Sequence, residues 1–101
     1  MYRITFLDSS KLDIHEIVSY IRNNSSDSSA LKFIKKIYKE SIRISLFPYG
    51  GIPFTSKKLK NIYRKTRVDK YNIFYIIDEN NKEVLIFRVL HHRRNIDNLF
   101  K

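Results

Sequence analysis

The first half of the chain shows one strand pattern followed by two helical patterns. Residues 2–7 are mostly β-branched and aromatic, which predicts a strand. Isoleucine and valine then recur at positions 14, 17, 18 and 21, the i, i+3, i+4, i+7 spacing of one helical face. A second helical seam follows the polar residues 23–26 and consists of Ala30, Phe33, Ile34, Ile37, Tyr38 and Ser41, continued by Ile42 and Leu46. Because only a short polar stretch separates the two helices, we predict an antiparallel helical hairpin.

Short polar side chains mark the expected start of each helix. Ser10 followed by Asp13 resembles a capping box for the first helix. Either Ser26 or Asp27 can cap the second helix. The acidic residues of the first helix are therefore interpreted as charges near a helix N-terminus, not as metal ligands: Asp8, Asp13 and Glu16.

The second half of the chain has the sequence pattern of a sheet, with apolar runs separated by short polar segments. Proline and glycine in residues 48–53 end the second helix, and we expect a loop from there to about Leu59. Strands are expected at residues 61–68, 71–77 and 84–90, and the last two are nearly unbroken apolar runs typical of strands buried on both faces. Short polar turns between them predict an antiparallel meander, one face of which the hairpin must cover. The sequence thus predicts one domain, residues 1–101, with an α+β fold of order β-α-α-β-β-β and an antiparallel-rich sheet.

The charge of the chain indicates its class of partner. Twenty Lys and Arg residues against ten Asp and Glu residues give a net charge of +10. Residues 1–55 carry eight basic and five acidic side chains, whereas residues 56–101 carry twelve and five. A lysine-rich genome could raise the total but would not explain this uneven distribution. Such a field favours nucleic acid, an anionic membrane face or an acidic protein.

Composition excludes several other classes. The hydrophobic fraction of 43% is enough for the single core that 101 residues can build. Cysteine is absent, which excludes disulfides and thiolate metal sites and fits a reducing cytoplasm. The apolar run at residues 2–7 is too short for a signal peptide, and no stretch approaches the roughly 20 apolar residues of a membrane span. We expect a cytoplasmic protein with no metal, no cofactor and no membrane partner.

Two stretches of the second half resemble a known toxin family. Residues 63–78, YRKTRVDKYNIFYIID, resemble the second and third strands of RelE/ParE toxins. Residues 84–94, VLIFRVLHHRR, resemble the fourth strand and its basic exit, where the family commonly places a histidine followed by a basic pair. The first strand, the hairpin and the linker around residues 46–51 also fit. The resemblance covers nearly the whole chain and is most specific from Tyr63 to Arg94.

The resemblance implies a toxin of a type II toxin–antitoxin module, of the plasmid-stabilising kind. Such a toxin inhibits growth and is neutralised by a cognate antitoxin, whose binding segment is often acidic or amphipathic. RelE-like members cleave mRNA in the ribosome, without a metal. ParE-like members act on DNA gyrase and are not nucleases.

The residues of the nuclease branch match only in part. Arg64 occupies the position of a sheet lysine in RelE-like enzymes, but Asn72 stands where those enzymes carry an arginine. The tail offers Leu99 and Phe100 in place of a catalytic tyrosine. His91 or His92 could supply a group titrating near neutrality, as in other ribonuclease members, although residues 61–66 lack the accompanying carboxylate. We therefore expect the ParE-like branch, with a RelE-like ribonuclease and a non-toxic binding module as alternatives.

The expected functional residues are basic. Candidates for binding the target or the antitoxin are Arg64, Arg67, Arg88, His92, Arg93 and Arg94. In a nuclease the catalytic candidates would be Arg64, Arg67, His92 and Arg93. The alternative for Arg64 and Arg67 is the solvated face of an edge strand, and the alternative for Arg88 is an ion pair with Glu83, Asp78 or the antitoxin. We expect His92 to be exposed and His91 to pack inward. The lysines at 57, 58 and 60 are interpreted as solvated, and Tyr63, Tyr71 and Tyr75 as sheet core or as stacking surfaces for bases.

Overall fold

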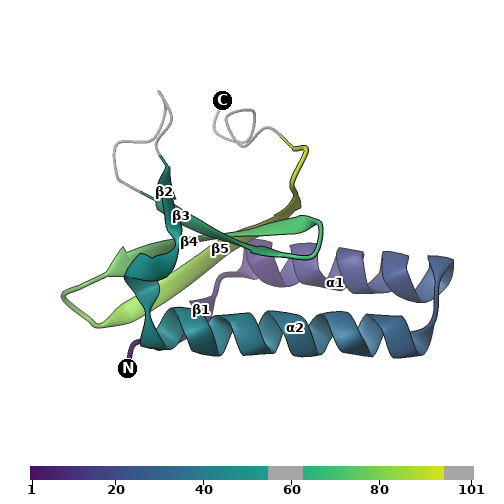
Figure 1. Cartoon of the computed structure of the whole chain (residues 1–101), viewed down its shortest axis with the longest axis horizontal. Coiled ribbons are helices and arrows are strands. Elements are labelled where there is room, and N and C mark those ends of the chain that lie inside the picture. Colours follow the sequence, from purple (N-terminus) through teal and green to yellow (C-terminus); the bar gives the residue numbers. More distant parts are fainter. Residues whose placement is uncertain (55–62, 95–101) are drawn as a thin grey trace.

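The protein forms two layers, a helical hairpin and a sheet (Figure 1). The computed structural model describes residues 1–54 and 63–94. The helices are α1 (Asp8–Asn24) and α2 (Asp27–Leu46), followed by a short 3₁₀ helix, η1 (Pro48–Gly50). The strands are β1 (Arg3–Phe6), β2 (Ile52–Phe54), β3 (Tyr63–Val68), β4 (Tyr71–Asp78) and β5 (Glu83–His91). The predicted α+β class is confirmed.

The sheet has five strands in the order β1-β5-β4-β3-β2. The antiparallel meander β3-β4-β5 is confirmed, and its first turn places Asp69 in the left-handed region with φ 53°. β1 lies parallel to β5 at one edge. At the other edge, β2 pairs with β3 where we expected a loop, so that expectation is wrong. A three-residue strand containing Pro53 has almost no periodicity to detect, and its proline is tolerated because β2 is an edge strand.

The helical hairpin is confirmed, but the first helix begins differently from the expectation. α1 starts at Asp8 with Leu7 at its N-cap position, and no side chain caps it. The hydroxyl of Ser10 donates to the carbonyl of Leu7 at 2.7 Å, so the predicted capping box is wrong. In α2 the choice between two caps is settled, because the Ser26 hydroxyl accepts a hydrogen bond from the backbone N–H of Ser29 at 3.0 Å.

The main core lies between the hairpin and one face of the sheet. Its buried members come from both helices and from β3, β4 and β5: Ile17, Val18, Ala30, Phe33, Ile37, Ile44, Val68, Ile73, Tyr75, Val84, Ile86 and Val89. Phe74, Phe87 and Leu90 form a second buried cluster with Phe54, Tyr63 and Ile76 partly buried around it. Strands β4 and β5 contribute to both clusters, as their nearly unbroken apolar sequences predict.

Two members of the predicted helical seam lie outside the core. Ile34 is 42% exposed and Tyr38 is 68% exposed, because the buried side of α2 runs through Ala30, Phe33 and Ile37. In Figure 1 the tip of the hairpin, where α1 ends and α2 begins, extends past the β3–β4 turn. The overall extents are 40 × 33 × 21 Å. Neither helix within residues 1–54 and 63–94 is long and apolar enough to cross a membrane.

Candidate functional site

Arg88, the basic residue inside the apolar strand β5, is held by α1. Its Nε and Nη2 atoms donate to the two carboxylate oxygens of Asp13 at 2.7 and 2.9 Å. The expected partners are therefore wrong: Glu83 pairs with Arg3 instead, at 3.5 Å. Asp13 is correspondingly a bridge to the sheet and not a helix N-terminal charge. The pair neutralises Arg88, so this guanidinium contributes to the fold.

The physical reason for this pair is the end of β1. Pairing between β1 and β5 stops at Ile86, so the rest of β5 has no strand on that side. Side chains of α1 replace the missing strand. The Ser9 hydroxyl donates to the carbonyl of Phe87 at 2.6 Å, and Asp13 accepts from the backbone N–H of Val89 at 2.9 Å. Buried backbone groups need such partners, and α1 supplies them.

Arg64, like Arg88, is bound to other parts of the fold. Its Nη1 donates to the carbonyls of Tyr49 and Gly51 at 3.1 and 2.9 Å, and its guanidinium lies 5.0 Å from the centre of the Tyr49 ring. In the sheet Arg64 stands opposite Tyr75, whose hydroxyl donates to the carbonyl of Pro48 at 2.6 Å. Burial raises the pKa of Tyr75, which keeps that hydroxyl a donor. Arg64 and Tyr75 thus anchor the segment that contains η1, and β3 is not the edge strand we considered, since β2 covers it.

Four polar residues, three of them cations, gather where the β3–β4 turn meets the end of β5. The backbone N–H of His92 donates to the carbonyl of Lys70 at 2.8 Å, which joins the two segments. Arg67 reaches the same turn and donates through Nε to the carbonyl of Asp69 at 2.9 Å. Arg93 follows directly. We call Arg67, Lys70, His92 and Arg93 the basic cluster.

The environment of His92 in the basic cluster favours the uncharged form of its imidazole. Partial burial, followed by electrostatic effects of Arg67, His91, Arg93 and Lys70, lowers the pKa of His92 below 6.5. The neighbouring carboxylate of Asp69 is paired with Lys36 at 2.9 Å and does not offset these charges. The cluster therefore presents cations around a neutral imidazole, an arrangement suited to binding an anionic group. Residues 1–54 and 63–94 contain no group of three or more His, Cys, Asp or Glu side chains that could hold a metal ion.

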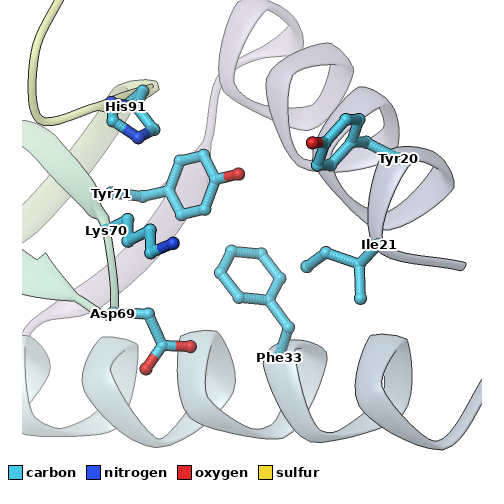
Figure 2. A pocket seen from close by; sticks show the side chains of 7 residues that line it. All are labelled: Tyr20, Ile21, Phe33, Asp69, Lys70, Tyr71 and His91. Atoms are coloured by element: carbon cyan, nitrogen blue, oxygen red, sulfur yellow. The ribbon is translucent and has the colours of Figure 1, made fainter. Parts of the chain in front are cut away.

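An aromatic groove borders the basic cluster. It encloses about 730 Å³ between the hairpin tip and the β3–β4 turn, and it is lined by Tyr20, Ile21, Phe33, Asp69, Lys70, Tyr71 and His91. Figure 2 shows the rings of Tyr20, Phe33 and Tyr71 converging from the two helices and the sheet. The Tyr71 ring meets Phe33 edge-on at 5.4 Å and His91 at 5.6 Å between centroids. Burial raises the pKa of Tyr71, which keeps its hydroxyl uncharged, while Asp69 and Lys70 are the charged residues of the groove wall.

The structure separates the predicted site residues into two groups. Arg67, His92 and Arg93 come together, whereas Arg64 and Arg88 serve the packing described above. Arg94 lies apart, in a hollow of about 220 Å³ that Asp13 and Glu16 of α1 also line. His92 is not fully exposed as expected: both histidines are half-buried and their rings stack at 4.6 Å, because β5 ends at His91 and strand alternation stops there.

Sequence reasoning missed the contribution of the helices to the groove. Tyr20 stands outside the apolar spacing of α1, and an aromatic residue at that position is the sequence signal that could have indicated a surface role; in the structure it is 62% exposed. Phe33 appeared only as a core position. The lysines at 57, 58 and 60 and the tail residues Leu99 and Phe100 lie outside the described residues.

Comparison with solved structures shows which known proteins share this fold. The fold is similar to a chain of the "Chromosomal ParDE TA system from P. aeruginosa", with a TM-score of 0.73, 15% identity, and coverage of 90% of this chain and 96% of that one. It is also similar to a chain of the RelBE toxin–antitoxin complex from Mycobacterium tuberculosis, with a TM-score of 0.56, 20% identity, and coverage of 89% and 96%. At these identities the likeness concerns the fold. A search of the curated proteins finds no match to this sequence.

The sequence itself matches the family model described as "ParE toxin of type II toxin-antitoxin system, parDE", over residues 4–96. This agrees with the resemblance carried by residues 63–78 and 84–94. The match spans nearly all of the chain, and the protein therefore belongs to the ParE toxin family of type II toxin–antitoxin systems.

Proposed function

We propose that this toxin inhibits growth by acting on DNA gyrase in the cytoplasm and that a cognate antitoxin neutralises it. One observation supports binding over cleavage. Two of the six arginines and histidines considered for catalysis or binding, Arg64 and Arg88, are committed to Gly51 and Asp13. What remains is the basic cluster, a surface for an anionic or acidic partner.

The chemistry of RNA cleavage explains why this arrangement favours the gyrase target. Metal-independent cleavage needs a base for the 2′-hydroxyl, an acid for the leaving oxygen and positive charge at the phosphate. Among the described residues, the cluster supplies the positive charge and the imidazole of His92, against which the His91 ring stacks, and the Asp69 carboxylate is occupied by Lys36. A protein-binding surface needs only the charge and the adjoining aromatic groove.

The test is a supercoiling reaction with purified gyrase and the purified toxin in excess. We expect relaxed or cleaved DNA, and we expect the double substitution Arg67→Glu and Arg93→Glu to abolish the effect. Arg3→Glu is the matched control, because Arg3 is an exposed cation at the other end of β5, beside Glu83. Normal supercoiling at excess toxin would contradict the proposal.

A RelE-like ribonuclease is the second candidate, and His92 is the observation that favours it. A neutral imidazole between Arg67 and Arg93 could accept a proton from a 2′-hydroxyl. In programmed ribosomes this candidate predicts mRNA cleavage that His92→Gln abolishes. Intact mRNA would remove it, and normal growth during overexpression alone would favour a non-toxic binding module.

The antitoxin is the partner that the whole family implies, and the charge of +10 supports an acidic or amphipathic binding segment. The toxin gene should arrest growth when expressed alone. Expression together with the adjacent reading frame should restore growth. Growth arrest that the adjacent frame does not relieve would contradict that frame as the antitoxin, and normal growth on expression alone would contradict the toxin.

A further inference from the structure

The aromatic groove has a packed wall and an unpacked one. On the packed wall, the Tyr71 ring contacts Phe33 and His91. On the other wall, Tyr20 of α1 forms no ring contact among the described residues and is 62% exposed. Figure 2 shows the Tyr20 ring across the groove from Tyr71, with Phe33 between the two walls. A hollow of about 730 Å³ with aromatic rings on both sides suits a flat, ring-shaped ligand.

The groove also contains polar groups that the fold does not use. Within residues 1–54 and 63–94, the hydroxyls of Tyr20 and Tyr71 form no hydrogen bond and Lys70 forms no ion pair. Figure 2 shows the Lys70 ammonium pointing towards the rings of the groove. The Asp69 carboxylate receives Lys36 on Oδ1 at 2.9 Å, and its Oδ2 accepts nothing in the same described ranges. The groove therefore presents a lysine donor beside a carboxylate acceptor.

The basic cluster begins at the rim of this groove. His91 lines the groove and its ring stacks on His92 at 4.6 Å, and Lys70 belongs to both the groove and the cluster. Arg67 and Arg93 are exposed, and neither forms an ion pair in the part of the chain that the structure describes. Guanidinium groups bind phosphate oxygens through short, charge-assisted hydrogen bonds. A phosphate would therefore be held directly beside the aromatic groove.

The adjoining groove and cluster select the ligand. An uncharged ring compound would leave the cations unused, and inorganic phosphate would leave the groove empty. A second copy of this chain would bring two basic clusters together, and like charges at an interface oppose binding. A nucleotide joins a flat base to a phosphate. We propose that the aromatic groove and the basic cluster form one site for a guanine nucleotide, with the base between Tyr20 and Tyr71 and the phosphate on Arg67 and Arg93.

Asp69 and Lys70 are the residues that favour guanine. Guanine carries the acceptors O6 and N7, to which lysine donates. Beside O6 it carries two donors, the N1–H and the amino group on C2, which a carboxylate can accept. Adenine has an amino group in place of O6, so a donor would face the Lys70 ammonium. The unpaired donor would weaken binding of adenine, which gives the site its specificity.

The test is calorimetric titration of the full chain with guanosine 5′-monophosphate (GMP). It contains neither gyrase nor ribosomes, because the inference goes beyond the proposed function, and either can fail without the other. We expect saturable one-to-one binding. Tyr20→Ser removes one stacking wall and should weaken the binding at least about fivefold. Tyr38→Ser removes a similarly exposed tyrosine of α2 that does not line the groove, and should change it by less than about twofold.

A second set of variants separates the phosphate from the base. Arg67→Gln with Arg93→Gln should weaken GMP binding at least about tenfold but change the binding of guanosine, which has no phosphate, by less than about twofold. Adenosine 5′-monophosphate (AMP) should bind at least about tenfold more weakly than GMP. Asp69→Asn should reduce that preference to less than about threefold, whereas Lys36→Gln, which removes only the ion-pair partner of Asp69, should preserve it.

The remaining arms identify the source of the nucleotide and the results that would overturn the proposal. A single-stranded trinucleotide with one guanine should compete with GMP, and tighter binding of the trinucleotide would assign the site to a nucleic-acid strand. Equal affinity for AMP and GMP would overturn the proposal. So would displacement of GMP by an equal concentration of inorganic phosphate, or no binding of GMP at millimolar concentration. All substituted side chains are exposed, so the variants should fold, which circular dichroism checks.

Discussion

Asp13 and Arg88 join α1 to β5 through two charge-assisted hydrogen bonds, although 75 residues separate them in the sequence. The same carboxylate accepts the backbone N–H of Val89. One side chain therefore neutralises a cation within the sheet and completes the hydrogen bonds of a strand whose neighbour has ended. This explains why a charged residue is tolerated between the apolar residues of β5.

Removing one partner of this pair should destabilise the fold strongly. Asp13→Ala leaves the half-buried guanidinium of Arg88 and the N–H of Val89 without partners, so the free energy of unfolding should fall by about 3 kcal/mol. Urea denaturation measures the change. Arg3→Ala breaks a more exposed pair with Glu83 and should cost less than about 1 kcal/mol. Equal losses in the two variants would show that Asp13 is not the bridge described here.

Two adjacent glycines should respond differently to alanine. A Cβ atom at Gly51 would press against the hydroxyl of Tyr75 and lie 3.1 Å from the carbonyl of Lys65, whereas at Gly50 the nearest atom, on Arg43, is 3.7 Å away. Gly51→Ala should therefore lower the free energy of unfolding by about 1–3 kcal/mol, as overpacking does. Gly50→Ala should change it by less than about 0.5 kcal/mol. Thermal melting of both variants distinguishes them, and a neutral Gly51→Ala would mean that Tyr75 moves freely.

Glu79, in the β4–β5 turn, should make stability depend on acid pH. Hydrogen bonds from Lys82, Tyr49 and Tyr2 lower the pKa of Glu79 from 4.5 to about 2. Because the pKa is lower in the folded protein, the stabilisation is complete above pH 4.5 and is lost as the pH falls towards 2. The stability difference between the protein and Glu79→Gln should therefore shrink over that interval in urea titrations. Tyr49→Phe removes one of these hydrogen bonds and should shift the loss of stability to higher pH, and a difference independent of pH would contradict this role of Glu79.

The pKa of His92 should be sensitive to the positive charges of the basic cluster. Burial and the surrounding cations hold it below 6.5. Arg67→Gln removes one of those charges, so the pKa should rise part of the way back towards 6.5, the effect of burial remaining. Chemical shifts of the imidazole protons across a pH titration measure it. Arg3→Gln should leave the value unchanged, and an unchanged value in Arg67→Gln would place Arg67 away from the imidazole.

The regular elements could be predicted because their periods are local. The spacing of Ile14, Ile17, Val18 and Ile21 alone indicates the buried side of α1. Hydrophobic periodicity does not identify the buried residues where an element is too short or carries two apolar faces. Thus β2 was not predicted. Ile34 and Tyr38 were assigned to the predicted seam, although they lie on an exposed apolar face of α2 next to its buried face.

For the candidate site, the sequence by itself determined the ParE-like family pattern, the excess of positive charge in the second half, and Arg67, His92 and Arg93 as candidates. Only the tertiary structure decided which cations are available. In the sequence, nothing distinguishes Arg64 and Arg88 from the other basic candidates. In the structure, Arg64 donates to the carbonyl of Gly51 and Arg88 donates to the carboxylate of Asp13, both distant along the chain. Hydrogen bonds and ion pairs act over a few ångströms in space, so the partner of a charged side chain depends on how the strands and helices pack and not on its sequence neighbours.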